Sequence, residues 1–251
     1  MKKLKFIHGR EYFSPSQLKK LYISIGSFVS YLNKSYVSSP QMELGSAIHK
    51  RLLEPYLFDE QYIVIDDTEI CAQIGGKRPK ATKAYTEWYA DFQLLHHDKI
   101  ILSTEDSFII EKIYEVADAS GILDTVFNGG IAETEVKKIV KDYDVPFNAL
   151  AIIDYDSKDF SYDLKTTSKP LHKFKYDANE LGYDIQAALT NSINGKPFVF
   201  IVVQTVEPFD IGVFTCSKAF LDRGKEKINK ALKNYEEYNE ICVNQVLNFE
   251  L

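Results

Sequence analysis

Several absences narrow what this chain of 251 residues can be. It holds three scattered cysteines, too few for the four thiolates of a [4Fe–4S] cluster and odd in number for a disulfide framework. It has no apolar run of about 18 residues, so we expect no membrane span. The N-terminal Met-Lys-Lys-Leu-Lys lacks the apolar stretch of a secretory signal. These absences predict a cytoplasmic protein, in a reducing compartment, without an iron–sulfur cluster.

The chain has enough apolar sequence for one core, and we expect one domain over residues 1–251. Hydrophobic residues make up 45% of the chain, and α/β domains of this length are commonly single units. Hydrophobic periodicity and end signals predict helices over residues 14–33, 41–55, 80–95, 105–119, 177–193 and 218–239. Strands are predicted over residues 62–65, 131–140, 147–155, 160–165, 198–206 and 210–216. The order of these elements predicts an α/β fold with a mixed central sheet flanked by helices.

The clearest chemical signal lies around Asp163. Asp163 and Lys165 are two apart on a predicted strand and share a face, while Leu164 points the other way. Asp154 ends the preceding apolar run, and a hairpin turn over residues 155–159 would bring it beside Asp163. Paired carboxylates suit Mg²⁺, and a neighbouring lysine can orient or deprotonate a water or neutralise developing charge. The motif predicts a divalent cation held against a phosphate.

Two further observations bear on this motif. Asp156-Ser-Lys158 has the same spacing, but its polar setting is typical of a turn. Gly45 and His49 are four apart on a predicted helix, where a small residue gives the imidazole room to face a metal or a phosphate. A lone histidine is more often structural, so His49 gains weight only from the rest of the pattern.

Taken in order, five motifs resemble the PD-(D/E)XK nucleases of the RecE (exonuclease VIII) type. They are Gly45-x-x-x-His49, the acidic strand Glu133-Thr-Glu135, Asp154, Asp163-Leu-Lys165 and Tyr183-Asp-Ile-Gln186. The likeness runs from about residue 12 to about residue 235. It implies a restriction-endonuclease-like core and an ATP-independent, Mg²⁺-dependent exonuclease in which Mn²⁺ substitutes. Such enzymes degrade one strand of duplex DNA, typically from the 5′ end.

The resemblance also implies a setting for the enzyme. Related nucleases work with a single-strand annealing protein in phage or prophage recombination, where the nuclease produces single-stranded DNA. They also form rings, so we expect a homo-oligomer. Two alternatives stay open: a nuclease of the same superfamily that prefers single strands or cuts internally, and a catalytically silent DNA-binding subunit.

Roles for the motif residues follow from the same resemblance. Asp154 and Asp163 would be metal ligands, with the carbonyl of Leu164 completing the set. Lys165 would be the catalytic lysine. Gln186 would position either Lys165 or the scissile phosphate.

The remaining ligands are less sharply defined. His49 would be a ligand or near-ligand of a second metal position. The upstream acidic residue falls on Glu133 or Glu135, which would share a face of a regular strand, and Glu135 is preferred.

The charge of the chain needs explaining if it binds DNA. The formal net charge is −6, whereas phosphate neutralisation supplies most of the affinity for DNA. We expect the basic residues to be segregated into local clusters, although such runs are commonly solvated faces. The DNA-binding candidates are Lys77, Arg78, Lys80, Lys169, Lys173, Lys175 and Tyr183.

Overall fold

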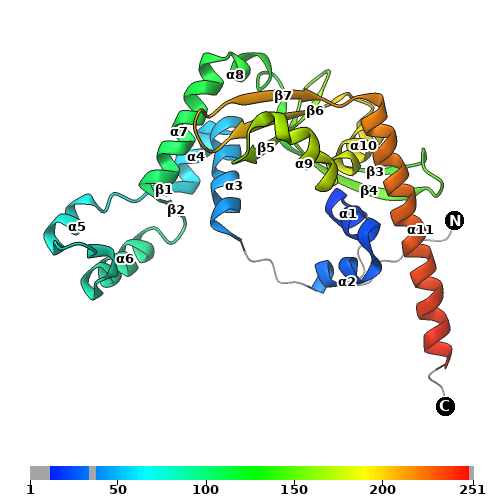
Figure 1. Ribbon diagram of the computed structural model, residues 1–251, viewed down its shortest axis with the longest axis horizontal. Coiled ribbons are helices and arrows are strands. Elements are labelled where there is room, and N and C mark those ends of the chain that lie inside the picture. Colours follow the sequence, from blue (N-terminus) through cyan, green and yellow to red (C-terminus); the bar gives the residue numbers. More distant parts are fainter. Residues whose placement is uncertain (1–11, 34–37, 249–251) are drawn as a thin grey trace. The chain divides into compact units, whose positions relative to one another are not determined.

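A computed structural model describes residues 12–33 and 38–248, with side chains up to residue 237 (Figure 1). The chain divides into two compact units. The first, here called the sheet unit, comprises Met1–Val37, Asn128–Val203 and Ile211–Leu251. The second, the helical unit, comprises Ser38–Phe127 and Gln204–Asp210. A single domain over residues 1–251 stays a prediction, and the N-terminal Met-Lys-Lys-Leu-Lys lies outside the described residues.

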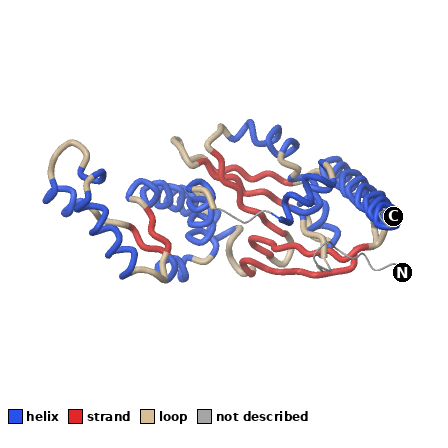
Figure 2. Tube along the Cα trace, turned by 90° about the horizontal axis from the view of Figure 1, so that it is seen from below, coloured by secondary structure: helices blue, strands red, loops and turns tan. Residues whose placement is uncertain are grey.

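The sheet unit is built on five strands in the order β3-β4-β5-β6-β7. They are β3 (Ile131–Val140), β4 (Phe147–Asp156), β5 (Ser161–Thr167), β6 (Phe198–Gln204) and β7 (Ile211–Thr215), drawn in red in Figure 2. Side chains of β4 alternate between buried and more exposed, whereas β6 is buried along its whole length, as a central strand covered on both faces should be. The predicted mixed sheet flanked by helices is therefore confirmed.

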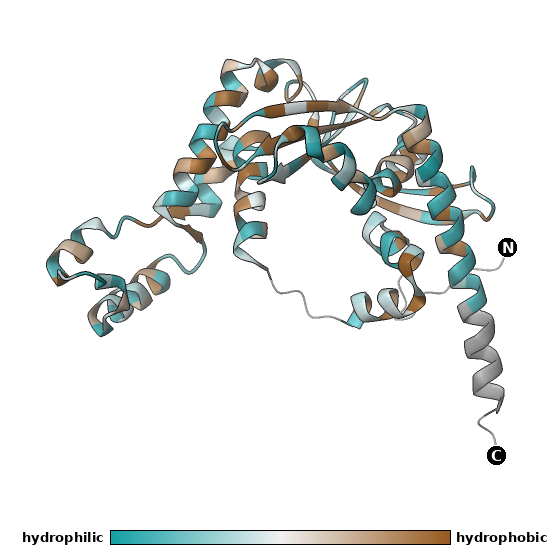
Figure 3. Cartoon of the chain, in the orientation of Figure 1, coloured by the Kyte–Doolittle hydropathy of each residue, from teal (hydrophilic) through white to brown (hydrophobic). Residues whose placement is uncertain are grey.

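Five α-helices and one short 3₁₀ turn of the sheet unit are described. They are α1 (Pro15–Ile23), α2 (Ile25–Asn33), η2 (Leu171–Lys173), α9 (Phe174–Glu180), α10 (Tyr183–Asn194) and α11 (Lys218–Asn248). Figure 3 shows hydrophilic and hydrophobic residues mixed along the coloured part of α11, whose buried residues include Ile228 and Tyr235. The ring of Tyr235 packs edge-on against Phe13 at 5.3 Å, in a core that also holds Phe28 and Phe147.

Two predicted helices are each divided in the structure. The segment 14–33 breaks at Ser24, which is extended and whose hydroxyl accepts a hydrogen bond from the Ser27 amide at 3.0 Å. Serine competes well for backbone groups in this way, so it ends one helix and caps the next. The segment 177–193 breaks at Gly182, which has φ of +66°. Glycine reaches this left-handed conformation without steric cost.

The helical unit contains seven helical segments and a small parallel pair of strands among its described residues. The helical segments are α3 (Pro40–Leu53), α4 (Pro55–Gln61), α5 (Thr68–Ile74), η1 (Pro79–Ala81), α6 (Lys83–Leu95), α7 (Thr104–Ala119) and α8 (Ile122–Thr125). The strands are β1 (Tyr62–Val64) and β2 (Ile100–Leu102), which pair in parallel. Helix α5 and strand β2 were not predicted, because each is too short for periodicity to detect.

Four aromatic residues of α6 recur at helical spacing, Tyr85, Trp88, Tyr89 and Phe92, a pattern that favours a core-facing stripe, but the structure gives a different result. No residue of α6 is buried. Tyr85 stacks on Tyr89 with centroids 6.2 Å apart, and Trp88 lies 5.5 Å from Phe92. The rings therefore cover one another along one side of the helix and remain half-buried.

Two of the sequence-based exclusions can be compared with the fold. Within the described part of the chain, no helix combines the length and the apolar character needed to cross a membrane. Cys71 and Cys216 are free thiols, and the side chain of Cys242 lies outside the described residues. The absence of an iron–sulfur cluster stays a prediction.

Candidate active site

The β4–β5 hairpin brings Asp154 and Asp163 together. The two strands pair antiparallel, with Asp156 opposite Ser161. The Phe160 amide donates to the Ser157 hydroxyl at 3.1 Å, which closes a turn shorter than the predicted one. Across the pair, the Leu164 amide donates to Asp154 Oδ2 at 2.8 Å. The structure thus places both carboxylates on neighbouring strands, as the period-2 argument requires.

Asp163 is the most enclosed carboxylate of the motif. Its side chain is 2% exposed. The Gln186 amide donates to Oδ1, and the Lys165 ammonium forms an ion pair with Oδ2. Apart from this ion pair, Oδ2 of Asp163 accepts no hydrogen bond of ordinary geometry from the described residues, although the atom is buried. A buried carboxylate oxygen with a spare lone pair is what a metal ligand needs before the metal binds.

The electrostatics of the site are those of crowded negative charge. Burial raises the pKa of Asp154 well above its usual range, and the charge of Asp163 raises it further. Burial alone would lower the pKa of Lys165, but Asp163 and Asp154 outweigh burial and raise it above its ordinary value. Lys165 is therefore a cation at neutral pH. The raised pKa of Asp154 means that its surroundings disfavour another negative charge, so the site favours added positive charge.

Glu133 is the acidic residue of β3 that comes close to Asp154. Carboxylate oxygens of Glu133 and Asp154 lie within 4.8 Å of each other. Glu133 has φ of +51°, a left-handed conformation that is uncommon for residues other than glycine and that interrupts the regular strand. Glu135 instead forms an exposed ion pair with Lys137 at 2.8 Å. The shared face expected for the two glutamates is thus broken at Glu133, and which of them binds metal stays a prediction.

These donors fit a hard divalent cation. The carboxylates of Asp163 and Glu133 both lie near Asp154, and the Leu164 carbonyl belongs to the same strand as Asp163. Mg²⁺ is usually held by one or two carboxylates together with water and substrate phosphate. The remaining lone pair on Asp163 Oδ2 and the raised pKa of Asp154 are both observations that a bound cation would account for.

His49 lies in the helical unit. It is on α3, one turn after Gly45, and is half-buried. Its part in a second metal position stays a prediction.

Tyr183 links Lys165 to a second lysine that the sequence analysis missed. The Lys165 ammonium lies 5.1 Å from the centre of the Tyr183 ring, and the Lys19 ammonium lies 4.8 Å from it. Burial and, to a smaller extent, the charge of Lys165 lower the pKa of Lys19 to about 8, although Asp163 opposes the shift. Lys19 comes from α1, more than 140 positions before Lys165, so no short motif could have found it.

Asp184 was also missed, although it stands inside the Tyr183-to-Gln186 motif. It is fully buried and forms ion pairs with Arg223 at 2.8 Å and Lys227 at 2.6 Å. Both partners belong to α11. Asp184 therefore fixes α10 against α11 and, through α10, the positions of Tyr183 and Gln186.

The basic residues after β5 have mixed surroundings. Lys169 forms an ion pair with Asp177 at 2.8 Å, whereas Lys173 is exposed. Lys175 lies over the ring of Tyr176 at 4.9 Å. All three are on the sheet unit, close in sequence to β5, and their role in DNA binding stays a prediction.

The basic cluster before α6 belongs to the helical unit. Lys80 forms an ion pair with Asp67 at 2.5 Å, and the Tyr85 hydroxyl donates to the same carboxylate at 2.5 Å. Lys77 and Arg78 are exposed. An ion-paired Lys80 contributes less free charge to a DNA surface than Lys77 or Arg78.

Comparison with protein families gives one match that spans most of the chain. A family described as a PDDEXK-like domain of unknown function (DUF3799) matches residues 14–244. No curated protein sequence matches the chain.

Solved structures give likenesses at low sequence identity. A protein of Eubacterium rectale assigned as an exonuclease has a TM-score of 0.55 and 14% identity, covering 90% of this chain and 82% of that one. An alkaline exonuclease from Laribacter hongkongensis has a TM-score of 0.34 and 14% identity, covering 77% of this chain and 98% of that one. A phage-related exonuclease from Haemophilus somnus 129PT has a TM-score of 0.36 and 12% identity, covering 73% and 98%. The similarity to the Eubacterium rectale protein shows the fold, whereas the TM-scores of the other two are too low to support an argument.

Proposed function

The chain belongs to the family of PDDEXK-like domains DUF3799, and from this membership we propose that it is a Mg²⁺-dependent, ATP-independent exonuclease acting on duplex DNA. The predicted fold and the resemblance to PD-(D/E)XK nucleases are confirmed, and they indicate a nuclease, a hydrolase acting on DNA. The metal, the 5′-to-3′ direction and the production of single strands for recombination are parts of the proposal. So are a cytoplasmic location, a homo-oligomer and an annealing partner.

One observation carries the proposal: the enclosed group of Asp163, Lys165 and Gln186 beside Asp154. The buried Asp163 has an ammonium on one oxygen and an amide on the other. Asp154 is held in place by the Leu164 amide although its pKa is raised. A protein that only bound DNA would gain stability by replacing one of two repelling carboxylates, so their presence supports catalysis.

Each residue has a definite part in the reaction. Asp154, Asp163, the Leu164 carbonyl and one of the β3 glutamates would hold the cation. When bound there, a divalent cation neutralises charge on the phosphate and lowers the pKa of a water for attack.

The neighbouring side chains position the reacting groups. Lys165, already charged, would stabilise the negative charge that builds on the phosphate. Gln186 would fix the orientation of Asp163, to which it donates a hydrogen bond. Lys19, over the ring of Tyr183, would supply a second positive charge for the backbone of the strand being cut.

The test is digestion of linear duplexes labelled separately at the 5′ and 3′ ends, with Mg²⁺ or EDTA and without ATP. We expect Mg²⁺-dependent release that begins at the 5′ label, and no cleavage of closed circles. Release from internal positions or cleavage of circles would favour the endonuclease alternative. No cleavage with Mg²⁺ or Mn²⁺ would contradict the proposal and favour the silent subunit.

The chain offers a matched control for this test. Asp156-Ser-Lys158 repeats the Asp-x-Lys spacing in the hairpin turn, where Lys158 is exposed. Lys165→Ala should abolish cleavage, whereas Lys158→Ala should retain it. Equal loss in both variants would mean that the effect is not specific to the active site.

A further inference from the structure

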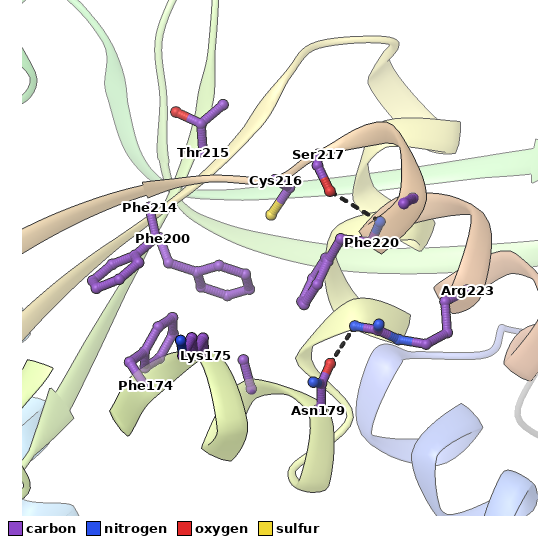
Figure 4. A pocket seen from close by; sticks show the side chains of 12 residues that line it. Phe174, Lys175, Asn179, Phe200, Phe214, Thr215, Cys216, Ser217, Phe220 and Arg223 are labelled. Carbon is purple, nitrogen blue, oxygen red and sulfur yellow. Dashed lines mark hydrogen bonds between the residues drawn. The ribbon is translucent and has the colours of Figure 1, made fainter. Parts of the chain in front are cut away.

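A pocket lined by phenylalanines lies beside the active site, between α9, the strands β6 and β7, and the first turn of α11. Its volume is about 300 Å³. Figure 4 shows the rings of Phe174, Phe200, Phe214 and Phe220 around it. Phe174 lies 4.9 Å from Phe214, and Phe200 lies 6.3 Å from Phe220. Phe174 and Phe200 are buried, while Phe214 and Phe220 are half-buried and border the opening.

The rim of this phenylalanine pocket is polar and cationic. Lys175, Asn179, Ser217 and Arg223 line it. Arg223 donates to the Asn179 side chain and to the buried Asp184 at 2.8 Å, and its guanidinium lies 5.1 Å from the Phe220 ring. The arginine is thus held at the mouth in one orientation, with part of its charge offset by Asp184, and the exposed Lys175 supplies the freer positive charge there.

One aromatic ring separates the pocket from the catalytic lysine. The Tyr183 ring lies 5.8 Å from Phe174 and 5.6 Å from Phe200, and its other contact is the Lys165 ammonium at 5.1 Å. Cys216 also lines the pocket, and burial together with the nearby charge of Asp163 raises its pKa to about 12. The pocket and the carboxylates are therefore neighbours within the sheet unit.

We propose that the phenylalanine pocket receives one unpaired base of the DNA strand next to the phosphate being cut, with Lys175 and Arg223 facing the strand's backbone. The inference rests on the proposed function and adds a base subsite to it. Aromatic rings stack on any base, so such a pocket binds without regard to sequence. A volume of about 300 Å³ is at the lower end for ligand pockets and suits one planar group, not a base pair. The base must therefore leave its stack to enter.

The test measures binding without cleavage. The probes are single strands of about 12 nucleotides, a length within the usual site sizes for single-strand binding. Each strand carries one abasic position, at a different place in each, and binding is measured in EDTA. We expect the affinity of the wild-type protein to fall about tenfold when the abasic position is the one that faces the pocket. Other positions should change affinity little.

Variants of Phe220 assign the effect to the pocket. Phe220→Leu keeps an apolar side chain but removes the ring, so the penalty for the abasic position should disappear. Phe220→Tyr keeps the ring and should keep the penalty. Phe160→Leu is the control, because Phe160 is an exposed ring in the β4–β5 turn and does not line the pocket. Each variant is first checked for an unchanged unfolding midpoint.

The possible outcomes separate this inference from the proposed function. A penalty at one position that depends on Phe220 supports the base subsite, even if the protein cleaves no DNA with Mg²⁺. A uniform response along the strand, or a penalty unchanged in Phe220→Leu, overturns the base subsite while leaving the cleavage assay to decide the proposed function.

Discussion

Glu133 and Glu135 offer a paired perturbation whose two effects on Mg²⁺ binding should differ. Carboxylate oxygens of Glu133 and Asp154 lie within 4.8 Å of each other, near enough for both residues to contact one cation. Changes around a metal site typically lower metal affinity by about 10- to 100-fold. Glu133→Gln should therefore lose about 1.4 to 2.7 kcal/mol of the stabilisation that saturating Mg²⁺ gives the wild type.

Glu135→Gln is the matched control. Glu135 pairs with Lys137 at 2.8 Å, with both side chains about half exposed, and such pairs contribute about 0 to 1 kcal/mol. The loss of this ion pair should change stability by no more than this amount, and equally in EDTA and in Mg²⁺. The two glutamates are thus predicted to differ in their effect on Mg²⁺ binding although they are two residues apart on the same strand.

Urea unfolding in EDTA and then in Mg²⁺ measures both effects. Mg²⁺ should stabilise the wild type and Glu135→Gln by mass action, and Glu133→Gln much less. Cleavage should fall about 100-fold in Glu133→Gln, as for other changes at metal sites, and little in Glu135→Gln. A Glu133→Gln protein that Mg²⁺ stabilises as much as it stabilises the wild type, or that cleaves normally while Glu135→Gln does not, would refute the reasoning.

The remaining predictions concern buried charge and close packing. Lys19→Met should raise the free energy of unfolding at pH 7 by about 1 to 3 kcal/mol, because burial holds the Lys19 pKa near 8. The unfolded lysine keeps its proton to about pH 10.5, so the stability advantage of Lys19→Met over the wild type should shrink as the pH rises from about 8 to 10. Urea unfolding at several pH values measures this change, and a variant less stable than the wild type at pH 7 would contradict it. Asp184→Ala should lower stability by about 3 to 5 kcal/mol by leaving Arg223 and Lys227 unpaired, and a loss below about 1 kcal/mol in urea unfolding would disprove that role. Gly224→Ala should lower the free energy of unfolding by about 3 kcal/mol, because the added carbon would lie 2.0 Å from the Asp184 carbonyl oxygen. Thermal unfolding measures this loss. The control is Gly26→Ala, whose added carbon would lie 3.8 Å from its nearest neighbour and which should be at least as stable as the wild type.

The parts of the site that the sequence predicts are local. Asp154, Asp163 and Lys165 lie on one hairpin, so strand periodicity and turn position are enough to bring them together. Gln186 was found through an ordered motif, and the structure gives it a hydrogen bond to Asp163. The fold class was predictable for the same reason, because most strands and helices have their own periodic signal.

The parts that the sequence does not predict depend on contacts between distant segments. Lys19 and Asp184 acquire their surroundings from packing of α1, α10 and α11, which no local pattern encodes. The left-handed conformation of Glu133 is likewise invisible, because glutamate has no preference for it. The split of helix 14–33 at Ser24 arises from a side-chain cap that competes with helix continuation.

The most direct test of the central claim compares wild-type protein with Asp163→Asn in cleaving a linear duplex at saturating Mg²⁺. The claim is that Asp163 helps to hold a divalent cation against the phosphate. It predicts that the wild type cleaves in Mg²⁺ and that EDTA abolishes this cleavage. It also predicts that Asp163→Asn does not cleave, although the variant is folded and unfolds in EDTA at least as cooperatively as the wild type. Cleavage by Asp163→Asn at the wild-type rate would contradict the account.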